Sequence, residues 1–115
     1  MAELTVQQIT IAGAEEAALV AASATGDKFD NDGKTFLKVA NGGGAPITVT
    51  IVGQKTLPLG TSASKAIAVT NGETWVIGPF PVGIFNTDGA NEVEVTYSAV
   101  TTVTVGAFSV NDQYN

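Results

Sequence analysis

Apolar and polar residues alternate along most of this chain with a period of two, which places successive side chains on opposite faces of a β-strand. The alternation is clearest in residues 46–53, where Ile47, Val49 and Ile51 share one face. Similar runs predict further strands at 34–41, 64–70, 73–78, 91–98 and 101–110. Short strands with turn signals between them are typical of an all-β sandwich or barrel. We therefore predict an antiparallel β-sandwich of jelly-roll or Ig-like strand order, as one domain spanning residues 1–115.

The segments between neighbouring runs carry turn residues and predict hairpins. An Asn-Gly pair, as at 71–72, is the strongest short hairpin signal, and glycines supply the positive φ that tight loops need. We expect three hairpins, with turns at Gly42–Ala45, at Asn71–Gly72 and at Ser98–Thr101.

The N-terminal residues are more polar and less regular than the later runs. Residues 1–12 predict an edge strand or an arm, with the core strands starting after Lys34. Such a segment adds readily to the sheet edge of a partner. The candidate protein-binding residues in it are Leu4, Val6, Ile9 and Ile11.

One stretch does not fit the strand period. Residues 13–24 are rich in alanine with acidic residues near the start, which favours a short helix near 14–23. The stretch is short for an independent helix, and an extended segment lying across a sheet fits equally well.

The stretch "GPFP" predicts a corner where the chain changes sheets. Pro79 and Pro81 interrupt strand pairing, and Gly78 permits a bend. Phe80 between the prolines is expected to close one end of the core. The apolar residues at 83–86 predict a short strand after this corner.

Composition excludes several classes of function. The 115-residue chain has a net charge of −6, with five lysines, no arginine, no histidine and no cysteine. Few basic groups argue against nucleic-acid partners and anionic membranes. Missing cysteine and histidine remove the commonest metal ligands and the commonest general base. We expect no cofactor, no metal and no membrane span, and the start of the chain lacks the pattern of a secretory signal.

The remaining polar clusters are better explained by structure than by chemistry. Asp27, Asp30 and Asp32 do not have the spacing of an EF-hand calcium loop and predict an Asx-type turn. We expect Glu92 and Glu94 on the solvated face of a strand, and we expect Glu15 and Glu16 to form an exposed acidic pair. Without histidine no serine is activated in the usual way, and a Ser–Lys dyad at Ser62, Ser64 and Lys65 lacks an oxyanion motif. We expect no enzyme.

The order of the motifs resembles small structural proteins that tailed phages and prophages encode beside their capsid genes. The run "GDKFDNDGKTFLKVANGGGAPITVTI", followed by "IGPFP", "FNTDG" and "VTYSAVTTVTV", carries this resemblance over residues 25–108. Many such proteins are more basic than this chain.

The resemblance implies a virion structural protein. Its best fit is a capsid decoration (cement) protein, which binds the major capsid protein on the exterior of the assembled shell and is made in the host cytoplasm. By analogy a homotrimer is expected. The alternatives are a tail or adaptor component, or a carbohydrate-binding β-sandwich that uses Trp75 or Tyr97, although both aromatics fall on the apolar phase of their strands and core positions are favoured.

Overall fold

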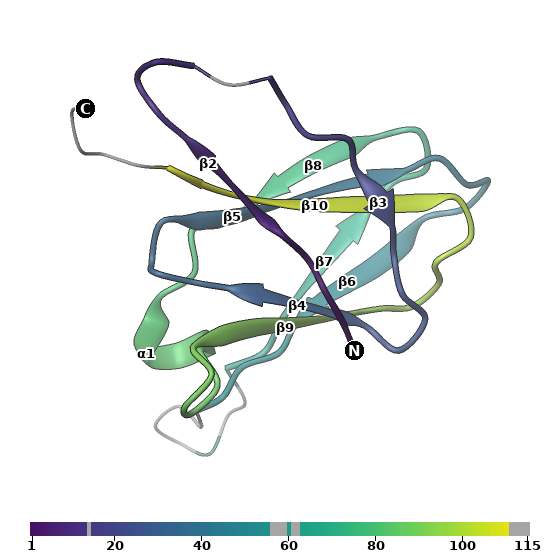
Figure 1. Ribbon diagram of the computed structural model, residues 1–115. Helices are drawn as coiled ribbons and strands as arrows, with labels where there is room; N and C mark the ends of the chain where they lie inside the picture. Colours follow the sequence, from purple (N-terminus) through teal and green to yellow (C-terminus); the bar gives the residue numbers. More distant parts are fainter. Residues whose placement is uncertain (14, 56–59, 61–62, 111–115) are drawn as a thin grey trace.

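Two β-sheets pack face to face in the computed structural model, which describes residues 1–13, 15–55, 60 and 63–110 (Figure 1). The order in sheet A is β1 (Ala2–Glu3), β4 (Asp27–Asp30), β9 (Glu92–Tyr97), β6 (Ile47–Ile51) and β7 (Lys65–Val69). The order in sheet B is β2 (Val6–Ile9), β10 (Val103–Val110), β5 (Thr35–Asn41) and β8 (Thr74–Ile77), and β3 (Val20–Ala21) also pairs with β10. These sheets confirm the predicted all-β sandwich.

Most strand pairs are antiparallel, but the N-terminal strands make both sheets mixed. β1 pairs in parallel with β4, and β2 pairs in parallel with β10. In an immunoglobulin arrangement three pairs of consecutive strands are neighbours within a sheet. From β4 to β10 only β6 and β7 are such a pair, so the strand order differs from the Ig-like alternative.

The core lies between the sheets and is built by the alternation seen in the sequence. Ile47, Val49 and Ile51 are buried, as are the inward residues of β9 and β10. The core also takes in Leu4 and Phe29, which precede Lys34. The expectation that the core strands start after Lys34 is therefore wrong, because β1 to β4 complete both sheets. The strand β4 itself was not predicted, since Phe29 is the only apolar residue in it.

The three expected hairpins are wrong, because each turn carries the chain from one sheet to the other. β5 and β6, β7 and β8, and β9 and β10 all lie in different sheets. The buried Asn41 side chain helps to hold two of these crossings together. Its Nδ2 donates to the carbonyls of Ala45 and Val69 at 2.9 and 3.1 Å, and its backbone carbonyl accepts from Gly72 N.

The corner after β8 carries the chain from sheet B to sheet A at one end of the sandwich. Phe80 is only 4% exposed, and its ring centroid lies 5.7 Å from that of Phe29 and 6.1 Å from that of Phe85. Gly78 has φ of 137°, and a Cβ there would meet Phe36 Cα at 2.9 Å, so a larger residue does not fit.

The strand predicted at 83–86 is wrong. One helical turn, α1 (Val82–Phe85), follows Pro81, whose carbonyl accepts from the amides of Ile84 and Phe85. Pro81 suits this position because proline fixes φ near the helical value and has no amide to leave unpaired.

Residues 15–23 contain no helix and run beside sheet B, where β3 pairs with β10. The extended alternative for the alanine-rich stretch therefore fits these residues, and residue 14 of the predicted range lies outside the described part. Tertiary pairing with β10 outweighs the helical preference of the alanines.

Candidate functional site

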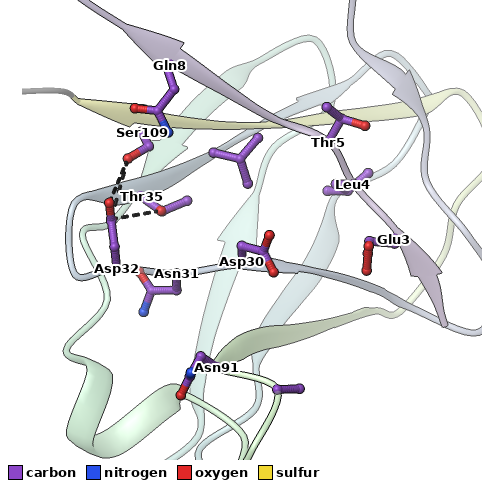
Figure 2. A pocket seen from close by; sticks show the side chains of 12 residues that line it. Glu3, Leu4, Thr5, Gln8, Asp30, Asn31, Asp32, Thr35, Asn91 and Ser109 are labelled. Atoms are coloured by element: carbon purple, nitrogen blue, oxygen red, sulfur yellow. Dashed lines mark hydrogen bonds between the residues drawn. The ribbon is translucent and has the colours of Figure 1, made fainter.

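Two hollows on the surface are candidates for a functional site, and the first is acidic. The acidic hollow has a volume of about 580 Å³ and lies between the β1–β2 segment and the turn after β4 (Figure 2). Its polar lining includes Glu3, Asp30, Asn31, Asp32 and Ser109.

The turn at the floor of this hollow is held by its own side chains. Asn31 Oδ1 accepts from Gly33 N at 3.0 Å, and Asp32 Oδ1 accepts from Lys34 N at 2.9 Å, which is the predicted Asx-type geometry. Asp32 also accepts longer bonds, at 3.4 Å, from the hydroxyls of Thr35 and Ser109, as Figure 2 shows. The polar groups of this turn are thus used to build it.

Among the described residues, the acidic side chains do not gather into a metal site. Asp27 is buried on the other side of β4, where its Oδ2 accepts from the Tyr97 hydroxyl at 2.7 Å. Burial and this hydrogen bond raise the pKa of the Tyr97 phenol above its usual value. Within the described residues no group of three or more His, Cys, Asp or Glu is placed to hold a metal ion.

Two glutamates approach each other beside the hollow. A hydrogen bond with Glu92, and the charge of that carboxylate, raise the pKa of Glu3. Glu92 is only 8% exposed and lies 3.6 Å from Lys28 Nζ, so the expectation that it is fully solvated is wrong. Glu94, the other residue of this predicted pair, is partly exposed.

The second hollow is an apolar groove on the outer face of sheet B. Two adjoining cavities of about 350 and 410 Å³ share Phe36 and Val76 in their linings. The Phe36 ring stacks on that of Phe108, with centroids 5.5 Å apart and an interplanar angle of 24°. We define the apolar groove by its six apolar lining residues, Ile9, Phe36, Val76, Pro79, Phe108 and Val110.

A segment of the chain itself covers the neighbouring part of this face. The Gln7 side chain donates to Glu15 O at 2.6 Å and accepts from Ala17 N at 2.8 Å. Glu16 Oε2 lies 2.6 Å from Lys38 Nζ. These bonds place residues 15–17 along one rim of the groove, while Val76 and Val110 stay 62% and 46% exposed.

The predicted protein-binding residues divide between the core and the surface. Leu4 is 6% exposed and belongs to the core, so it is not available to a partner, and Val6 packs partly against the core. Ile9 and Ile11 are 37% and 69% exposed. β2 is already paired with β10, so the segment is not a detached arm.

The groove residues other than Ile9 were missed by the sequence analysis, although a signal for them exists. Phe36, Phe108 and Val110 stand on the phase opposite to the buried Leu37, Val39 and Ala107. A strand with apolar residues at both odd and even positions has two apolar faces that both need to be buried. In this structure only the inner face of sheet B is fully buried.

Trp75 and Tyr97, the aromatic residues considered for sugar binding, lie in different sheets. Trp75 is 41% exposed at the edge of sheet B, which corrects its predicted core position, and its Nε1 donates to Glu73 Oε1 at 3.0 Å. Tyr97 is partly buried against the core. Of the serine–lysine group, Ser62 lies outside the described residues, and Ser64 Oγ accepts from Gly53 N at 2.9 Å.

The apolar groove is suited to contact with another macromolecule rather than to a reaction. Its lining combines aromatic and aliphatic side chains, and the charged residues in the linings of its two cavities, Glu16, Lys34 and Lys38, stand beside them. The part of the chain that the structure describes holds no helix long and apolar enough to cross a membrane. Comparison of the chain with protein-family models, with curated proteins and with solved structures found no match.

Proposed function

We propose that this protein is a phage capsid decoration protein, which binds the major capsid protein on the outside of the assembled shell and stabilises it. The order of motifs over residues 25–108 suggests this class. The observation that carries the proposal is the apolar groove on the outer face of sheet B. Contiguous exposed apolar surface of this kind marks interaction sites in soluble proteins.

The groove supplies the docking contact in this proposal. Ile9, Val76 and Val110 are 37%, 62% and 46% exposed. Burying the exposed part of each against a shell protein contributes a fraction of the about 1.5–3 kcal/mol of a complete transfer from water. Because the contact is largely apolar, we expect binding to weaken little as salt rises.

Stabilisation of the shell follows from linkage. A protein that binds the assembled capsid and not its free subunits adds RT ln(1 + [L]/Kd) per site, about 2.7 kcal/mol at a hundredfold excess over Kd. Repeated over many sites, this raises the temperature at which the shell opens.

The test compares particles that carry the protein with particles stripped of it. We expect decorated particles to withstand higher temperatures, and rebinding to fail for Val110→Asp and for Ile9→Asp. Val20→Asp is the matched control, because Val20 is 51% exposed and lies outside the groove. Equal heat resistance of the two particle types would reject the cement role.

Copy number separates this proposal from a tail or adaptor component. A decoration protein approaches the number of capsid subunits, whereas a tail component is present in a small ring. Quantitative gel densitometry of purified particles gives the ratio to the capsid protein. A ratio far below one copy per few subunits would favour the tail component.

The exposure of Trp75 supports a carbohydrate-binding module as the second candidate. An exposed indole can stack on a sugar ring, and 41% of Trp75 is open to solvent. A carbohydrate module predicts quenching of Trp75 fluorescence by an oligosaccharide and loss of binding in Trp75→Ala. A glycan array without signal would dismiss this candidate.

A further inference from the structure

The strand β8 forms an open edge of sheet B. Among the described strands, in the order β2, β10, β5, β8, it has a neighbour on one side only, and it lies at the edge of the sheet in Figure 1. Its four residues, Thr74–Ile77, include no charged residue and no proline, the usual devices that protect an edge strand.

The register with β5 determines which backbone groups of β8 are free. Asn41 N donates to the directly opposite Glu73 O at 3.0 Å, while Asn41 O accepts from Gly72 N. This direct bond places Asn41 and Glu73 at a hydrogen-bonded position of the ladder. In an antiparallel ladder such pairs alternate with non-bonded pairs. Trp75 and Ile77 therefore bond Val39 and Leu37, and the N–H and C=O groups of Thr74 and Val76 point away from β5.

We propose that β8 pairs antiparallel with β8 of a second copy of this chain, with Trp75 on the two-fold axis. In this register Thr74 of each copy stands opposite Val76 of the other copy. The free N–H and C=O groups of these four residues, two in each copy, are therefore all paired. The next register that keeps Thr74 and Val76 at hydrogen-bonded positions is two residues away, in either direction. It puts Gly78 or Gly72 opposite a strand residue, and Gly72 N already donates to Asn41 O. The central register alone pairs all the free groups within Thr74–Ile77.

Side chains and charges agree with a second copy as the occupant. The two Trp75 rings lie next to each other in a non-bonded pair, where Cα atoms are about 4.5 Å apart, and each covers the exposed surface of the other. Glu73 stands opposite Ile77 of the second copy, so the two carboxylates lie at opposite ends of the pair and no like charges face each other.

The other edges are less suited to this pairing. β7 begins with the exposed Lys65, and β1 has only two residues. β2 lies beside residues 15–17, to which the Gln7 side chain is hydrogen-bonded. The contact through β8 is small compared with the roughly 20–30 residues per side of a standard interface. The dimer is therefore weak and concentration-dependent in the isolated protein, and it does not depend on the proposed capsid function.

Cysteine cross-linking tests the register, because the chain has no cysteine of its own. Trp75→Cys places two sulfur atoms across the axis within disulfide reach, since bridged Cα atoms are about 4.4–6.8 Å apart. We expect oxidation to link Trp75→Cys into covalent dimers. Thr74→Cys and Val76→Cys should each stay largely monomeric alone and form a mixed dimer when combined.

The control is Val20→Cys, of similar exposure, at the opposite side of sheet B. Cross-linking of Trp75→Cys no faster than this control would overturn the proposal. So would faster self-linking of Thr74→Cys or Val76→Cys, because either result means a different register.

A second measurement uses the unmodified chain, in which Trp75 is the only tryptophan. Its emission should shift to shorter wavelength as concentration rises, together with an increase in mass by light scattering. Val76→Pro removes an edge N–H without removing a bond to β5 and should abolish both changes, while Val76→Thr keeps that N–H and should retain them. Emission and mass that do not change with concentration would overturn the pairing.

Discussion

The acidic hollow and the apolar groove differ in what satisfies their side chains. In the hollow, Asn31 and Asp32 are hydrogen-bonded to their own turn, so the polar groups of this turn are already in use. In the groove, Phe36 stacks on Phe108, but Val76 and Val110 remain open to solvent. The hollow holds more acidic side chains, yet the groove is the surface whose apolar side chains remain exposed. A binding partner is therefore better sought at the exposed apolar groove than at the acidic hollow.

The largest expected change in stability is at the corner between β8 and α1. Phe80→Ala should cost about 3–5 kcal/mol, because it empties a buried aromatic site between Phe29 and Phe85. Val76→Ala, on the groove side of β8, should leave the free energy of unfolding far closer to that of the unchanged chain, because Val76 is 62% exposed. Urea unfolding of the two variants measures the contrast, and equal costs would contradict it.

The N-terminal segment supplies the next test, because it contributes to both regions. Leu4→Ala should destabilise the fold by about 2–5 kcal/mol, since Leu4 is in the core. Ile9→Ala should cost about 1 kcal/mol or less, since Ile9 is partly open to solvent, and should weaken binding to particles instead. Thermal melting and particle binding of both variants separate the two effects. A folded Leu4→Ala of unchanged melting temperature would place Leu4 outside the core.

Acidity should affect the hollow through Glu3. The raised pKa of Glu3 means that its ionised form is disfavoured in the folded state. The stability from protonated Glu3 is thus present at acid pH and is lost as pH rises through its folded pKa. Glu3→Gln should melt slightly higher than the unchanged chain at pH 7, and the difference should vanish below the carboxyl range. A constant difference at every pH would reject the Glu3–Glu92 interaction.

The smallest expected effect is that of calcium on the acidic hollow. Because Asp32 is bonded within its turn and Asp27 is bonded to Tyr97, melting with excess calcium and with chelator should coincide. Differential scanning calorimetry under the two conditions measures this. A shift of several degrees would show that the acidic residues bind the ion.

The sequence allowed the faces of most strands to be predicted, but not their partners. Alternation assigns Ile47, Val49 and Ile51 to the core because burial depends on each strand alone. Whether a turn such as Asn71–Gly72 closes a hairpin or crosses between sheets depends on contacts from distant strands. Asn41 supplies such contacts here, and nothing at residues 71–72 records them.

The candidate site was predicted only in part, for a related reason. Ile9, predicted to bind a protein, is partly exposed in the structure, and its binding role stays a prediction. Leu4 was not recognisable as core because the local pattern around it is irregular. The exposure of Trp75 follows from the position of β8 at the sheet edge. That position is a property of the whole strand order, which the alternation within residues 73–78 does not contain.

The position of β10 sets the order in which the protein can fold as it is synthesised. β10 leaves the ribosome after all the other strands, yet it lies between β2 and β5 and also pairs with β3. Sheet B therefore cannot form completely until β10 has been synthesised. Until then β2 and β5 lack their common neighbour and must avoid pairing with other strands. Pairings so distant in sequence are typical of domains that fold in milliseconds to seconds. Folding of the sandwich is thus expected to finish only after β10 has been synthesised.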